Sequence, residues 1–274
     1  SMSTVPAVEG DARIAAAGRV LCLVGAAAGL LGLIGWLGGM PALTTVVPGQ
    51  PAMKGNTAIG LLLLGVAAAL RSREAPQRVL RAGSVALATV VLGIGVATLA
   101  EYALRFDLGI DMLLIADQDG PFPGRPSPPT AVALTLLAGA LLLFEVRPKA
   151  RVRPAEVLTL IAGLTALIAL LGFAFGAGPL YRMPFAEVTG VAVPTAGALL
   201  LISAGMLLVR PCAGLMTVLC APGPGAMLLR RFVPAMVVAP LVLKGAATLL
   251  LESFGFADDQ MIAAVTVGWI TVLG

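Results

Sequence analysis

The sequence predicts an all-α fold, an integral membrane bundle of about eight transmembrane helices with both chain ends in the cytoplasm. Of the 274 residues, 59% are hydrophobic and only 12% are charged, whereas soluble domains carry roughly 25% charged residues. The mean hydropathy is +1.01. So little charge cannot cover the surface of a water-soluble protein of this size, so the expected solvent and first partner of the chain is the lipid bilayer.

The gaps between charged residues define the expected helices, because roughly 20 apolar residues are needed to cross the hydrocarbon core. Ser1 ahead of the first Met is typical of a cloning remnant, so residues 1–12 are assigned to a tag remnant and a cytoplasmic tail. Residues 13–274 are assigned to one transmembrane domain, with an output domain expected beyond them in the cytoplasm. The expected helices cover residues 20–43, 56–70, 82–100, 129–144, 157–180, 188–209, 232–251 and 261–274.

Basic residues concentrate in every second loop. Thirteen Arg and Lys residues precede the first stretch or lie in alternate loops, and the other loops hold four, namely Lys54, Arg105, Arg125 and Arg182. The positive-inside rule places the richer set in the cytoplasm, which predicts a multi-pass protein of the bacterial inner membrane. The same topology explains the net charge of +4, so we expect no nucleic-acid partner.

Three expected helices open with related triplets. These are Asn56-Thr57-Ala58, Pro129-Thr130-Ala131 and Pro194-Thr195-Ala196. Each follows a Pro-containing outer stretch and precedes an apolar span that ends in a basic turn, which predicts a helical hairpin used about four times. Helix capping or hydrogen bonds between helices are the expected roles of Asn56 and the three Thr residues.

Several kinds of site are excluded by composition. The chain has no His, which excludes a His-ligated haem, a His-based metal site and a His general base. We found no phosphate-binding Gly loop and no nucleophile–base pair, so we expect no catalytic residue, no metal and no cofactor, and the segment is not expected to be an enzyme. Asp107, Asp111, Asp117 and Asp119 have the oxygen ligands that Ca²⁺ prefers, but a solvated acidic loop is the favoured interpretation.

Lys244 is the most informative candidate for ligand binding. It lies 13 positions after Arg231, about 20 Å into the membrane, where a charge costs at least about 2.5 kcal/mol. It should pair with an acid, lose its proton or extend to the interface. The candidate acids are Glu101, Glu187 and Glu252, and a structural ion pair is favoured over a ligand-binding or proton-sensing site.

Glu101 and Tyr102 form the second candidate, at the outer end of the third expected helix. The carboxylate could receive a cationic ligand or Lys244, although an ordinary interfacial Glu beside an aromatic belt residue is favoured. Trp36 could line an outer pocket, but helix packing is the preferred interpretation. Arg182, in an outer loop, completes a candidate set of Lys244, Glu101, Tyr102, Glu252, Trp36 and Arg182.

The stretch Met53-Lys54-Gly55-Asn56-Thr57-Ala58, continuing Ile-Gly-Leu-Leu-Leu-Leu-Gly, resembles a segment of bacterial sensor proteins. Their polytopic N-terminal membrane domains (MASE-like) carry Met-x-x-Asn-Thr-Ala-hydrophobic-Leu-Leu-Gly and precede PAS domains, a histidine-kinase core or a diguanylate-cyclase core. Glu101-Tyr102 with residues 107–111, and residues 231–240, are also similar, whereas Lys244 departs from the pattern. The resemblance implies a sensor role and a homodimer, and carries over no catalytic residue.

Together these observations predict a signal-input domain of a bacterial two-component protein, a sensor histidine kinase by preference and a diguanylate cyclase as second choice. It would bind a small apolar or amphipathic ligand, or sense a membrane property, and relay the signal through its last helix. The alternative is a small-molecule transporter or permease, with Lys244 on its polar path.

Overall fold

The computed structural model describes residues 5–45, 51–71, 78–111, 122–146, 153–175 and 190–209, and short pieces at 217, 223–228 and 231. Its named elements are all helices, which confirms the predicted all-α class for the described residues. They are α1 (Val5–Leu37), α2 (Pro41–Thr44), α3 (Gly55–Leu70), α4 (Arg78–Leu104), α5 (Pro128–Leu142), α6 (Pro154–Ala174) and α7 (Val193–Leu208).

Three long helices alternate with three short ones. Ala12–Leu37 of α1, α4 and α6 are long and apolar enough to cross a membrane, whereas α3, α5 and α7 are apolar but shorter. The short helices have 16, 15 and 16 residues, about 24 Å of helix. The structure therefore supports a membrane protein, but the predicted eight transmembrane helices are not confirmed.

The predicted and observed helix bounds agree best at α3, which begins one residue before the predicted stretch. The stretch 20–43 is divided, because α1 ends at Leu37, Gly39 adopts a φ of +62° and Pro41 begins the separate α2. The helix expected from residue 188 begins only at Val193, since the preceding Ala192 is extended and Pro194 occupies the first turn.

The other helices do not begin and end at the limits that the positions of the charged residues predicted. α4 extends past both limits of the predicted 82–100, with Glu101 in its last turn. α5 ends at Leu142 rather than at residue 144. α6 begins three residues before the predicted 157. Residues 176–180 of that stretch, and the stretches 232–251 and 261–274, lie outside the described residues.

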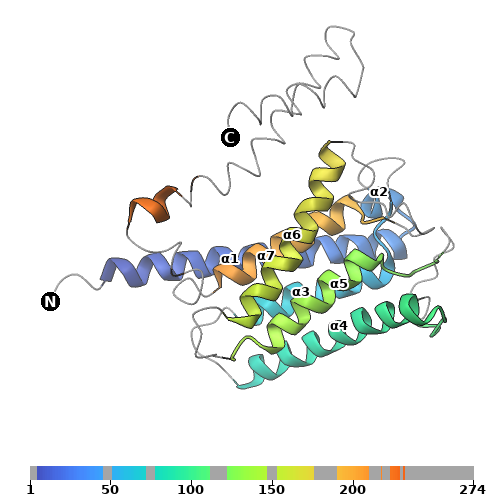
Figure 1. Ribbon diagram of the computed structural model, residues 1–274, viewed down its shortest axis with the longest axis horizontal. Helices are drawn as coiled ribbons and strands as arrows, with labels where there is room; N and C mark the ends of the chain where they lie inside the picture. Colours follow the sequence, from blue (N-terminus) through green and yellow to red (C-terminus); the bar gives the residue numbers. More distant parts are fainter. Residues whose placement is uncertain are drawn as a thin grey trace, which may run out of the picture.

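The six main helices form a closed ring in the order α1, α3, α4, α5, α6, α7 and back to α1. The hairpin pairs α1/α3, α4/α5 and α6/α7 occupy successive thirds of this ring, and α1 and α7 lie side by side although far apart in sequence (Figure 1). The short helices α3, α5 and α7 also contact one another. The arrangement is therefore an inner triangle of short helices surrounded by long ones.

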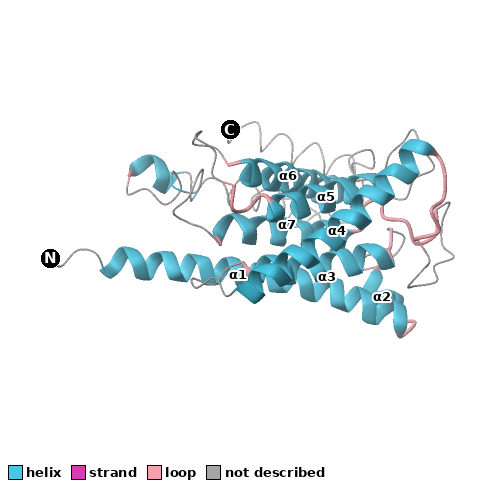
Figure 2. Cartoon of the chain, turned by 90° about the horizontal axis from the view of Figure 1, so that it is seen from below, coloured by secondary structure: helices cyan, strands magenta, loops and turns pink. Residues whose placement is uncertain are grey.

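Burial follows the same division. In the most hydrophobic stretches of α1, α4 and α6, only 33%, 28% and 33% of the residues are buried. Large apolar side chains such as Leu31, Val90 and Leu164 are exposed on the outer faces of these helices. Figure 2 shows α1 and α4 running along the length of the bundle. Such a surface suits lipid rather than water.

The three related triplets open the three inner helices. Thr57, Thr130 and Thr195 are each 2% exposed, and the Ala residue that follows each Thr is fully buried. Three of the about four predicted hairpins are thus structural repeats, in which a long outer helix is followed by a short inner one, and the fourth lies outside the described residues. The capping role predicted for the triplets is wrong, because the N-cap residues are Lys54, Ser127 and Ala192 and none makes a side-chain capping bond.

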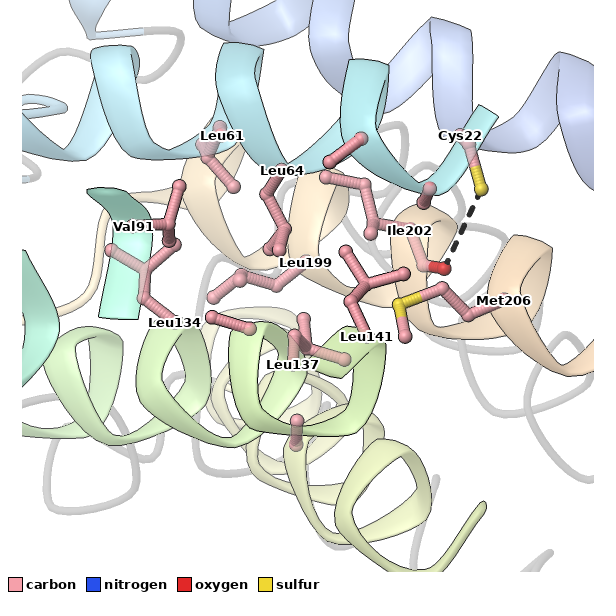
Figure 3. Close-up of a cluster of buried hydrophobic side chains, with 14 of the residues drawn as sticks. Cys22, Leu61, Leu64, Val91, Leu134, Leu137, Leu141, Leu199, Ile202 and Met206 are labelled. Atoms are coloured by element: carbon pink, nitrogen blue, oxygen red, sulfur yellow. Dashed lines mark hydrogen bonds between the residues drawn. The ribbon is translucent and has the colours of Figure 1, made fainter. Parts of the chain in front are cut away.

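The core at the centre of the ring consists mainly of leucine and alanine side chains from α3, α5 and α7, and it also includes Cys22 of α1 and Val91 of α4 (Figure 3). Leu64, Leu137 and Leu199 are almost fully buried there. On the outer side, Gly29 of α1 approaches the α3 backbone so closely that a Cβ would lie 2.6 Å from the Ala58 carbonyl oxygen. Such glycines let the long helices pack directly against the inner triangle.

Candidate functional site

Two buried arginines lie at opposite ends of α3, α4 and α5. The Arg125 cluster comprises Glu101, Tyr102, Asp107, Asp111, Phe122 and Arg125, where α4 ends and α5 begins. The Arg71 cluster comprises Arg71, Ser84, Phe144 and Glu145, where α3 and α5 end and α4 begins. The core between them is mainly apolar, so the buried charges of the described residues gather at these two ends.

The guanidinium of Arg125 contacts three carboxylates. Its Nε atom lies 2.6 Å from Asp111 Oδ2 and 3.3 Å from Glu101 Oε2, and its Nη2 atom lies 3.6 Å from Asp107 Oδ1. The Arg125 side chain is only 7% exposed. A guanidinium removed from water in this way requires charged partners, and the carboxylates supply them.

Two aromatic rings complete the surroundings of Arg125. Its Cζ atom lies 5.3 Å from the ring centroid of Tyr102 and 5.2 Å from that of Phe122. The two rings contact each other edge to face at 5.6 Å, and the Tyr102 hydroxyl donates a hydrogen bond of 3.1 Å to the Pro126 carbonyl. Cation–π contacts strengthen when the cation is desolvated, as it is here.

Local backbone conformation brings these residues together. Arg105 has a φ of 54° and ends α4 in the left-handed conformation that commonly follows a helix. The chain then folds back, and the Leu108 N–H donates a 2.9 Å hydrogen bond to Glu101 Oε1. Gly124 has a φ of +71° and lies against the Asp111 carbonyl, where a side chain would collide. The loop geometry therefore fixes Asp111 and Arg125 beside the end of α4.

Hydrogen bonds connect the Arg125 cluster to the first hairpin. The Asn56 side-chain amide donates to the carbonyls of Ile110 and Asp111, at 3.2 and 3.4 Å. The Trp36 indole N–H donates a 2.8 Å bond to the Met53 carbonyl, just before α3. The cluster is thus linked to α1, α3, α4 and the start of α5.

Carboxylates outnumber the guanidinium at this site. The Asp111 carboxyl experiences a hydrogen bond and the charge of Arg125, the charge of Asp107 and a side-chain hydrogen bond with Glu101. Glu101 is fully buried, and Glu101 Oε2 and Asp111 Oδ1 have no hydrogen-bond partner among the described residues. Asp107, with a side chain 74% exposed, opens the cluster to solvent. Counted over the described residues, the site therefore holds more acidic than basic groups and two buried oxygens without a hydrogen-bond donor.

The two loop groups of the closest ion pair have shifted pKa values. Burial raises the pKa of Asp111, and this effect outweighs the opposing hydrogen bond and charge of Arg125. Burial alone would lower the pKa of Arg125, but the hydrogen bond and charge of Asp111, together with Glu101, raise it. Arg125 therefore stays charged, and burial weakens the acidity of its partner Asp111 instead.

The Arg71 cluster pairs its guanidinium differently. Arg71 Nη1 lies 3.1 Å from Glu145 Oε1, and Nε donates a 3.1 Å hydrogen bond to the Ser84 hydroxyl, which itself donates to the Ala67 carbonyl at 2.8 Å. The Glu145 side chain is 36% exposed, so water reaches the carboxylate. The contacts join the ends of α3, α4 and α5 without a surplus of buried acid among the described residues.

Three of the six predicted ligand-binding candidates lie among the described residues. Glu101 and Tyr102 belong to the Arg125 cluster, and Trp36 is half-buried at the same end of the bundle. Lys244, Glu252 and Arg182 lie outside the described residues, so the proposed pairing of Glu101 with Lys244 stays a prediction. The partner observed for Glu101 is Arg125, which the sequence analysis counted only among the outer-loop cations.

The solvated acidic loop predicted for residues 105–128 is wrong at Asp111, which is 7% exposed. The Pro-rich stretch 121–128, directly before the buried first turn of α5, is the signal that could have indicated a fixed position for Arg125. Comparisons with protein-family models, curated proteins and solved structures found no match. The function is therefore argued from the geometry of the site.

Proposed function

We propose that the chain is the membrane-embedded signal-input domain of a bacterial signal-transduction protein, a sensor histidine kinase by preference, and that its stimulus acts at the Arg125 cluster. One observation carries the proposal. A buried, incompletely compensated charge cluster joins the ends of four helices in a bundle that presents an apolar surface. The likeness of residues 53–65 to bacterial sensor segments supports the same function.

A signal-input site needs two helix arrangements with different affinities for the stimulus. The Arg125 cluster meets the structural part of this requirement, because Arg125 on the α5 side holds Glu101 on α4. A change in the charge balance there would alter the force between α4 and α5. Both helices continue to the Arg71 cluster at the other end, so a shift of one against the other is transmitted across the bundle.

The proposal is tested with the full-length protein in proteoliposomes, by measuring the activity of its output domain. Arg125→Gln removes the charge that holds Glu101 and should change either basal output or the response to stimulus by about tenfold, the range of typical allosteric coupling. Gly93→Ala is the matched control, since a Cβ at Gly93 meets no atom within 4 Å. Unchanged output from a folded Arg125→Gln protein would contradict the proposal, and solute flux abolished by this change would favour the transporter alternative.

A further inference from the structure

We infer that the Arg125 cluster binds a divalent metal cation of the Ca²⁺ and Mg²⁺ class, through carboxylate oxygens of Glu101, Asp107 and Asp111. Binding itself does not depend on the signalling proposal. Only its consequence does, namely that the cation would set the state of the sensor. The inference starts from the ligand chemistry, because hard divalent cations prefer carboxylate and carbonyl oxygens.

The three carboxylates have the spacing of a metal site. One oxygen from each of Glu101, Asp107 and Asp111 lies within 4.8 Å of the others. Ca²⁺ binds oxygen at roughly 2.3–2.6 Å, so two ligands on opposite sides of the ion are separated by about twice that distance. The carboxylates can therefore reach one ion with small side-chain adjustments.

Unpaired acceptors provide an independent indication. Glu101 is fully buried, and its Oε2 atom forms an ion pair with Arg125 Nε at 3.3 Å but accepts no hydrogen bond from the described residues. Asp111 Oδ1 also has no hydrogen-bond partner in the described part of the chain, although Oδ2 of the same carboxylate binds Arg125. Buried polar atoms are nearly always paired with a protein group, water or an ion. These two oxygens are therefore positioned to accept a ligand.

The charge balance favours a divalent ion. When all three carboxylates are ionised, they and the one guanidinium leave two negative charges, which a divalent cation neutralises while Arg125 keeps its place. An organic ammonium ion would instead have to displace Arg125, because the rings of Tyr102 and Phe122 already lie against that guanidinium. The exposed Asp107 gives the ion a path from solvent.

Direct binding tests the inference on the full chain in a nonionic detergent, because anionic lipids would bind the same ions. After chelation, equilibrium dialysis with radioactive Ca²⁺ at about pH 7.5, where free carboxylates are ionised, should show one ion per chain. We expect a Kd on the order of 0.1–1 mM, as in weak extracellular Ca²⁺ sites, and competition by Mg²⁺. Trp36 emission, measured in a Trp269→Phe background, should change with the same midpoint, because Trp36 bonds to Met53 beside Asn56.

Asp107→Asn is the decisive variant, since an exposed side chain is replaced by one of equal shape and folding is preserved. It should weaken Ca²⁺ binding at least about tenfold, as loss of one anionic ligand does, and Glu101→Gln should do the same where it folds. Glu145→Gln, at the other end of the bundle, is the control and should retain wild-type affinity.

Absence of saturable binding up to about 10 mM, well above the weak-site range, would overturn the inference, as would wild-type affinity in Asp107→Asn. If Ca²⁺ binds but the output of the full-length protein does not change, the result would contradict the signalling proposal, while the inference of a metal site would stand. The two failures are therefore distinguishable.

Discussion

The two buried arginines of this bundle are stabilised in opposite ways. Arg125 is surrounded by three carboxylates and two aromatic rings, and one of those carboxylates, Glu101, is fully buried. Arg71 pairs with Glu145, whose side chain is 36% exposed, and donates a hydrogen bond to the hydroxyl of Ser84. Both guanidiniums are almost completely buried, with side chains 7% and 5% exposed, so the difference lies in the acids and not in the arginines.

This difference separates a structural ion pair from a site with unused binding capacity. At the Arg71 end, the Glu145 carboxylate is partly exposed to water, and the Ser84 hydroxyl accepts a hydrogen bond from Arg71 and donates one to the Ala67 carbonyl. At the Arg125 end, two carboxylate oxygens are buried without a hydrogen-bond donor from any residue that the structure describes. A buried arginine by itself therefore indicates little about function, whereas an excess of buried acid around it indicates a place for a proton or a cation.

The largest expected effect is the loss of the arginine itself. Arg125→Ala leaves Glu101 and Asp111 as uncompensated buried acids and should lower the free energy of unfolding by about 3–5 kcal/mol. Arg71→Ala should cost about 1–2 kcal/mol, because the partly exposed Glu145 can be hydrated. Denaturation by SDS in mixed micelles, followed by circular dichroism, measures both. Equal losses would remove the distinction between the two ends.

Replacing each arginine by lysine should lower the free energy of unfolding by less than replacement by alanine does, and the loss should again be larger at Arg125 than at Arg71. Lysine keeps the charge but lacks the planar guanidinium whose Nε faces Asp111 and Glu101 while its Nη2 faces Asp107. We expect Arg125→Lys to cost about 1.5–3 kcal/mol, the value of a hydrogen bond to a charged group. Arg71→Lys should cost less in the same denaturation experiment, and a larger loss at Arg71 would contradict the comparison.

The aromatic contacts should contribute less again. Phe122→Leu removes the edge-to-face contact with Tyr102 and one cation–π contact with Arg125, an expected loss of about 1 kcal/mol. Phe144→Leu removes a more distant contact, with Arg71 at 5.9 Å, and should cost about 0.5 kcal/mol. Thermal unfolding in detergent compares the two variants. Similar destabilisation by both would show that the rings serve packing alone.

The smallest expected effect is a dependence on pH. Burial raises the pKa of Asp111 above its ordinary value of 3.8, so the folded protein holds that proton more tightly than the unfolded chain. Stability should therefore fall as pH rises through the range just above the ordinary value. Asp111→Asn should reduce this slope, as measured by unfolding in chelator-treated samples. A wild-type stability that rises over this range would contradict the assignment.

The sequence by itself determined the all-helical class of the described residues, the apolar helices that suit a membrane, the position of α3 within one residue and the hairpin repeat with its Thr-Ala starts. These features are local, because hydropathy, charge spacing and proline positions act within one segment of the chain. The break between α1 and α2 is also local, at Gly39 and Pro41, but charge spacing alone did not reveal it.

Only the tertiary structure decided which helices are inner and which carbonyls, acids and cations meet. Short and long apolar segments look alike in composition, and the closed ring depends on α1 packing between α3 and α7. The pairing of Glu101 with Arg125 spans 24 positions of sequence and rests on the backbone conformations of Arg105 and Gly124. Charge counts record such residues as loop cations and acids, because burial and partner choice arise only when the loop folds onto the end of α4.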